Sequence, residues 1–188
     1  QVGGEDYVLG GIAKGSGMVH PNMATMLAFL ATDAPVEQNF LHAALTKAVD
    51  SSFNMITVDG DTSTNDTVII LANGVAGGDT IGAGNPGAEI FINALGEVCT
   101  DLAKRIAMDG EGATKLIEVA VRGALTENDA RAAAKSVASS TLVKSAVHGG
   151  DPNWGRIIAA LGYSGAELDE SKIALYINDV CIMEGGRP

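Results

Sequence analysis

Short apolar runs and longer apolar stripes with helical spacing follow one another along the first half of the chain. The runs at residues 7–13, 26–31 and 67–72 are bounded by glycine or polar turn residues and predict strands. After Asp33, a candidate helix N-cap, apolar residues recur every three or four positions and predict a helix. A second such stripe predicts a long helix over about 87–108.

The second half of the chain continues the same alternation. Thr126 with Asp129 three residues later is typical of a helix start with a capping box. Further elements are expected at 116–121 (strand), 141–144 and 154–158 (helices), and 172–177 and 180–183 (strands). Strands that alternate with helices predict the α/β class. Because no repeat or low-complexity linker interrupts the chain, we expect one continuous domain over 1–188, incomplete at both ends.

The net charge, the cysteines and the hydropathy of the chain argue against several classes of protein. The formal net charge is −11, which argues against binding to a nucleic-acid phosphate backbone. Cys99 and Cys181 lie apart in apolar surroundings without CxxC spacing, so we expect two buried, reduced thiols rather than a disulfide framework or a zinc site. No apolar run approaches the length of a membrane span. These features predict a cytoplasmic protein that does not act at a membrane.

The segment 10–27 concentrates the candidate chemistry. It places glycines, Lys14, His20 and Thr25 between two expected strands. The pattern alone fits a glycine-rich hairpin with a solvated lysine. A phosphate-binding loop is disfavoured because such a loop requires the lysine after its second glycine, at the start of a helix. Here Lys14 precedes Gly15 and a strand follows.

Four blocks of sequence resemble the ornithine acetyltransferase family, the bifunctional glutamate N-acetyltransferases of arginine biosynthesis. They occur in the family's order and nearly cover the chain: residues 10–27, 59–66 (DGDTSTND), 109–115 (DGEGATK) and 148–156 (HGGDPNWGR). The resemblance implies a layered sandwich of mixed sheets flanked by helices, shared with self-processing aminopeptidases. It also implies autocatalytic cleavage of the Ala24–Thr25 bond. Residues 1–24 would then end an upstream chain, and 25–188 would begin a downstream chain.

The chemistry of Thr25 fits such a cleavage. A threonine hydroxyl is a poor nucleophile unless a base takes its proton. Its own α-amine can serve as that base only when Thr25 is the first residue of a chain. A free α-amine has a pKa of about 7.7–8.0, so a useful fraction is neutral near neutral pH. Breaking the Ala24–Thr25 bond therefore creates the base that the nucleophile needs.

The resemblance also implies the reaction and two substrate contacts. Thr25 would take the acetyl group from N2-acetylornithine as an ester, and the amine of glutamate would then attack that ester. No metal or organic cofactor is expected, because the acetyl group travels on the protein; some members also accept acetyl-CoA. Lys14 and Glu111 match substrate-binding positions of the family. An ammonium suits the α-carboxylate of the substrate, and a carboxylate suits the free amine of ornithine.

Other polar residues are expected to be structural. His20 is interpreted as a turn residue, since the Thr25 amine supplies the base. His148, Asp151 and Asn153 fit a loop and helix start, with Asp151 or Asn153 as the cap. The set Asp59, Asp61 and Asp66 resembles a calcium loop but lacks the glutamate at the twelfth position, so a hydrogen-bonded turn near the nucleophile is predicted.

Several alternatives stay open at this stage. A self-processing aminopeptidase would pass the acyl group to water, a non-catalytic relative would bind an amino acid as a sensor, and a nucleotide-binding module would bind ATP. The family's oxyanion donors lie in an upstream Thr-Gly pair and further substrate contacts lie in a C-terminal tail. Neither is present in these 188 residues, so this chain alone is expected to be inactive or nearly so. The resemblance implies an α/β heterodimer of cleaved chains that pairs into a heterotetramer.

Overall fold

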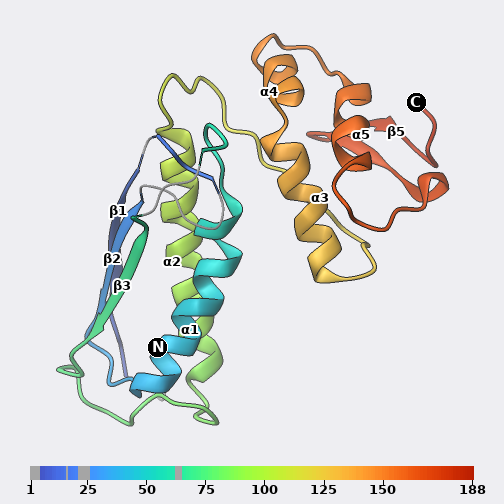
Figure 1. Ribbon diagram of the computed structural model, residues 1–188. Helices are drawn as coiled ribbons and strands as arrows, with labels where there is room; N and C mark the ends of the chain where they lie inside the picture. The colour runs from blue at the N-terminus through green and yellow to red at the C-terminus, as the bar shows by residue number, and fades with distance from the viewer. Residues whose placement is uncertain (1–4, 16, 21–25, 62–64) are drawn as a thin grey trace. The chain divides into compact units, whose positions relative to one another are not determined.

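The computed structural model describes residues 5–15, 17–20, 26–61 and 65–188. These residues form two compact units, 1–113 and 114–188, which are considered one at a time. Figure 1 shows the strands and helices of each unit. Ala24 and Thr25, the predicted cleavage site, lie outside the described residues.

The first unit contains a mixed three-stranded sheet with the order β1–β2–β3. Its strands are β1 (Leu9–Lys14), β2 (Leu27–Thr32) and β3 (Thr67–Ala72). β2 pairs antiparallel with β1 and parallel with β3, and the register places Lys14 opposite Leu27 and Leu27 opposite Thr67. The end of β1 and the starts of β2 and β3 therefore lie at one edge of the sheet.

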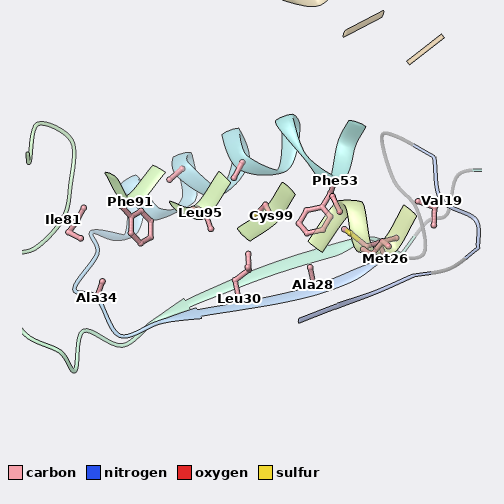
Figure 2. Packing of buried hydrophobic residues seen from close by; sticks show 14 residues of the cluster. Val19, Met26, Ala28, Leu30, Ala34, Phe53, Ile81, Phe91, Leu95 and Cys99 are labelled. Carbon is pink, nitrogen blue, oxygen red and sulfur yellow. The ribbon is translucent and has the colours of Figure 1, made fainter. Parts of the chain in front are cut away.

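Two long helices cover one face of this sheet (Figure 1). They are α1 (Gln38–Ser51), which leads into the short 3-10 helix η1 (Phe53–Met55), and α2 (Ala88–Met108). β2 alternates buried and exposed positions, so Ala28 and Leu30 face the helices. Figure 2 shows these two side chains beneath Leu95 and Cys99 of α2, all within one core cluster.

Gly11 permits the close approach of α2 to β1. A Cβ atom at this position would lie 2.6 Å from Leu30 Cδ2 and 3.1 Å from Leu102 Cδ1. Such separations are below van der Waals contact, so a larger residue here would force the side chains of Leu30 and Leu102 to shift. The opposite face of the sheet exposes apolar side chains, among them Ile12, Phe29 and Leu71.

The second unit has a small helical core and a hairpin. Its elements are α3 (Glu127–Ser139), α4 (Thr141–His148), α5 (Trp154–Gly162), the 3-10 helix η2 (Glu170–Lys172), β4 (Leu175–Ile177) and β5 (Val180–Met183). Val137, Val143 and Ala160 form its buried centre, one from each of the three α-helices. β4 and β5 lie within the stretches 172–177 and 180–183, where strands were predicted, and they pair antiparallel.

Three sequence predictions about local structure are wrong. Asp33 does not begin a helix: its carboxylate accepts a hydrogen bond from Val8 N (2.8 Å), and α1 starts at Gln38. Residues 116–121 form no strand, because within the described residues no neighbouring strand pairs with them. Cys181 is exposed, whereas Cys99 is fully buried as expected; both are free thiols.

Candidate functional site

The candidate site is built at the sheet edge where β1 ends and β2 begins. Lys14 is the last residue of β1, has an exposed side chain, and pairs with Leu27. Leu27 follows Thr25 by two residues along the chain. The antiparallel register therefore brings the predicted substrate lysine to the strand end that continues from the predicted nucleophile.

Asp59 fixes the turn that follows β1. Its Oδ2 accepts a hydrogen bond from Met18 N (2.6 Å), and its Oδ1 accepts bonds from Val19 N (3.1 Å) and Asp61 N (3.0 Å). Met18 has a φ of 51°, a left-handed conformation that is uncommon for a residue other than glycine. The carboxylate of Asp59 thus holds the backbone of this turn from a position about forty residues further along the chain.

Asp66 makes the corresponding contact on the other side of the predicted cleavage site. Its Oδ1 accepts a hydrogen bond from Met26 N (2.8 Å), and Thr67 N donates to Met26 O (3.0 Å). The side chain of Met26 is 5% exposed and belongs to the core cluster of the first unit. The residue immediately after Thr25 is therefore held through its N–H, its carbonyl and its side chain.

Glu111 reaches the same region from the end of α2. It follows Gly110, whose Cα packs so tightly on Val58 that a Cβ there would lie 2.8 Å from Val58 Cγ1. A Cβ built on Gly17 would lie 3.6 Å from Glu111 Oε2 and 3.9 Å from Asp59 Oδ2. Gly17 therefore lies beside two carboxylates, and the predicted substrate residue Glu111 lies next to the turn that follows Lys14.

The two structural aspartates differ in how their surroundings act on ionisation. Burial would raise the pKa of Asp59, but hydrogen bonds from the backbone of Asp61, Met18 and Val19 outweigh it and lower the pKa from its ordinary value of 3.8. Burial also raises the pKa of Asp66, and the single bond from Met26 N only partly opposes this. Asp59 is accordingly held as a carboxylate by its backbone donors.

The remaining polar candidates have structural contacts. His20 Nδ1 lies 3.1 Å from Thr57 Oγ1, which ties the turn before the predicted cleavage site to the segment that carries Asp59. The predicted hydrogen-bonded turn is confirmed at Asp59 and Asp61 by the bond from Asp61 N to Asp59 Oδ1, while Asp59 and Asp66 also bind the distant backbone of Met18, Val19 and Met26. Across the described residues, no group of three or more His, Cys, Asp or Glu side chains is arranged to hold a metal ion.

The block 148–156 lies in the second unit and forms the start of α5. Asn153 accepts a hydrogen bond from Arg156 N (3.2 Å), which confirms it as the helix cap, and Asp151 Oδ2 accepts from Asn153 Nδ2 (2.9 Å). His148 Nδ1 lies 3.4 Å from Thr114 Oγ1. Lys115 Nζ donates to the carbonyls of Val147 and His148, so it caps the end of α4.

Two features of the site were not predicted from the sequence. One is the role of Gly17 and Gly110, which lie inside the blocks 10–27 and 109–115 and allow Glu111 and Asp59 to approach the same turn. The other is the role of Met26 as the partner of Asp66. The sequence signal for this contact was the position of Asp66 directly before the strand 67–72, which pairs with the strand that begins after Thr25.

The fold and the site thus define an α/β protein that carries a lysine at one sheet edge and carboxylates beside the turn that follows it. The family model described as ArgJ family matches residues 1–188, and the chain belongs to that family. Among curated relatives, the chain is 57% identical over 188 residues to the arginine biosynthesis bifunctional protein ArgJ of Symbiobacterium thermophilum, and 55% and 50% identical over 187 residues to those of Geobacillus stearothermophilus and Bacillus subtilis.

The coverage of these matches is uneven. The alignments include all of this chain but 47% of the Symbiobacterium protein and 46% of the other two. The chain therefore spans about half the length of the curated relatives it matches. A crystal structure of the arginine biosynthesis bifunctional protein ArgJ from Bacillus halodurans is similar, with a TM-score of 0.81 and 47% identity over 83% of this chain and 73% of that one. The predicted α/β fold class is confirmed.

Proposed function

We propose that the protein containing this chain transfers the acetyl group of N2-acetylornithine to glutamate through an acetyl ester on Thr25. It would first cleave itself between Ala24 and Thr25. The observation that supports this most directly is the position of Lys14 and the tightly held Met26 at one sheet edge, with Glu111 beside Gly17 in the turn that follows Lys14. The chain belongs to the ArgJ family, and its relatives are named arginine biosynthesis bifunctional proteins, which supports a reaction in arginine biosynthesis.

The roles of the site residues follow from their charge and position. Lys14 would bind the α-carboxylate of the substrate, since an ammonium forms a charge-assisted hydrogen bond with it. Glu111 would receive the amine of ornithine, since its carboxylate lies beside Gly17 in the turn that follows Lys14. After cleavage the Thr25 amine would take the proton of the Thr25 hydroxyl as the acetyl ester forms, and the ester carries the acetyl group until glutamate attacks.

The assembly and location are also proposals. We propose that residues 1–24 end one chain and 25–188 begin the next within a single catalytic domain. The two cleaved chains would stay together and pair into a heterotetramer in the cytoplasm. Within the described residues, no helix is long and apolar enough to cross a membrane. Neither a metal nor an organic cofactor is required by this chemistry.

A test of the proposal uses the full-length protein with acetylornithine and without an acceptor. The downstream chain should gain the mass of one acetyl group on Thr25, and glutamate should then remove it as N-acetylglutamate. Release of free acetate with no capture by glutamate would instead indicate a hydrolase. No acetylation of the wild-type protein, together with unchanged ligand binding by Thr25→Ala, would indicate the amino-acid sensor.

A further inference from the structure

Two aspartates of one short block hold the backbone on both sides of the predicted cleavage site. Asp59 binds the N–H groups of Met18 and Val19, and Asp66 binds the N–H of Met26. Both contacts join residues about forty positions apart in the chain. Asp66 is the more informative of the two, because its partner is the residue covalently attached to Thr25.

We propose that Asp66 is a positioning residue for Thr25, acting through the Met26 N–H in both self-cleavage and acetyl transfer. This inference rests on the proposed function, in which Thr25 is the nucleophile. The bond that breaks in self-cleavage is Ala24–Thr25, so the Thr25–Met26 peptide and its N–H are the same before and after it. One hydrogen bond can therefore serve both reactions.

The planarity of the peptide unit transmits the effect. The N–H and Cα of Met26 lie in the same plane as the carbonyl and Cα of the residue before them. The Met26 carbonyl accepts from Thr67 N, and the Met26 side chain is buried, so the Met26 side of that plane is anchored. The bond from Met26 N to Asp66 Oδ1 restrains rotation of this plane about its Met26 end. Through that restraint, Asp66 would act on the residue that precedes Met26.

The Asp66 carboxylate accepts the Met26 N–H, where a backbone carbonyl would be the acceptor if the sheet continued. Thr67 N to Met26 O is a step of the parallel pairing between β2 and β3, and Met26 N turns to the Asp66 side chain. Burial raises the pKa of Asp66, so the surroundings disfavour its charged form. Shifted pKa values of this kind are common at functional sites. The contact is also removable by mutation without a change in the backbone pairing.

The chain offers a matched control in Asp33. This aspartate directly follows the opposite end of β2, and its Oδ1 accepts a hydrogen bond from Val8 N at 2.8 Å, the same length as the Asp66 bond. It lies at the sheet edge away from Lys14. Asp33→Ala therefore removes an equivalent carboxylate-to-backbone bond from the same sheet without touching the site.

The experiment compares wild type, Asp66→Ala, Asp66→Asn and Asp33→Ala as full-length proteins. Intact mass gives the cleaved fraction with time, and acetyl transfer per cleaved molecule gives kcat and KM. For Asp66→Ala we expect slower cleavage and a kcat lower by about 10- to 100-fold, the range for a nucleophile misplaced by about 1 Å, with KM for acetylornithine within about 3-fold. Asp66→Asn, whose amide oxygen can accept the Met26 N–H, should recover most of both rates.

Several results would overturn the inference. These are wild-type rates in Asp66→Ala, an equal loss in Asp33→Ala, no recovery in Asp66→Asn, or a change confined to KM. If circular dichroism shows that Asp66→Ala does not fold, Asp66→Glu decides, since it keeps a carboxylate but moves it by one methylene. A kcat at least about 3-fold below wild type at unchanged KM then supports positioning, and a wild-type kcat refutes it. Failure of the wild-type protein to cleave or transfer acetyl would instead refute the proposed function.

Discussion

Replacing Gly110 by alanine should loosen the turn that carries Glu111. The new Cβ would lie 2.8 Å from Val58 Cγ1 and 3.3 Å from both Val58 Cγ2 and Ala107 O. Ordinary contact begins at 3.4 Å, so the turn or Val58 must move by about 0.6 Å. Val58 is itself restrained, because its N–H donates to the carbonyl of the buried Val19 (2.7 Å). The backbone of Gly110 has no positive φ, so the clash is the main penalty.

The size of the effect follows from these contacts. Overpacking of this kind costs about 1–3 kcal/mol, and the lower entropy of the unfolded alanine chain returns about 0.4–1 kcal/mol. Taking the middle of each range, we expect Gly110→Ala to lower the free energy of unfolding by about 1.3 kcal/mol. Because Glu111 is the next residue, KM for acetylornithine should rise as well.

Urea unfolding of the full-length protein, followed by steady-state kinetics, measures both effects. Gly96→Ala is the matched control, since Gly96 lies within α2 and in the described part of the chain no atom lies within 4 Å of its added Cβ. That variant should be more stable than wild type by about 0.5–1 kcal/mol with unchanged KM. Equal stability of Gly110→Ala and wild type would show that the turn is not packed on Val58 as described.

Three further predictions concern other parts of the fold. Asp59→Asn should destabilise the protein at neutral pH. Because the pKa of Asp59 is lowered in the folded state, its contribution to stability is present above pH 3.8 and is lost as the pH falls through the folded-state pKa. The urea midpoints of variant and wild type should therefore converge below about pH 4. Burial raises the pKa of the Cys99 thiol to about 11, so iodoacetamide followed by peptide mapping should label Cys99 only after unfolding, and rapid native labelling would contradict its burial. Asn153→Ala removes the cap of α5 and should cost about 1 kcal/mol in thermal unfolding, whereas an unchanged midpoint would show that the cap contributes nothing.

Apolar spacing and capping residues predicted correctly the helices and strands that depend mainly on neighbouring residues in the sequence. The strand 67–72 and the helix ending at Met108 were predicted to within a residue, because their apolar spacing and bounding residues are unambiguous. Thr126 accepts from Asp129 N as the capping pattern required. Residues 116–121 have the apolar, β-branched composition of a strand, yet a strand also needs a paired neighbour, and that depends on topology rather than on local sequence.

The candidate site shows the same division. Lys14, Glu111 and the aspartate block were all found by resemblance, and their partners were not. The bonds from Met18 and Met26 to Asp59 and Asp66 span about forty residues, so they depend on the tertiary fold, in the case of Met26 on the β2–β3 pairing, and not on any local pattern. Asp33 shows the converse error, since its carboxylate holds Val8 across the sheet instead of starting the helix that follows it.

The central claim is that Thr25 becomes a nucleophile by freeing its own amine, and intact mass of the denatured full-length protein tests it most directly. The account predicts two species for the wild type, whose masses place the break between Ala24 and Thr25, and one uncut species for Thr25→Ala. A wild-type protein that remains a single chain while it transfers acetyl groups would contradict the account, because the base assigned to the reaction would not exist.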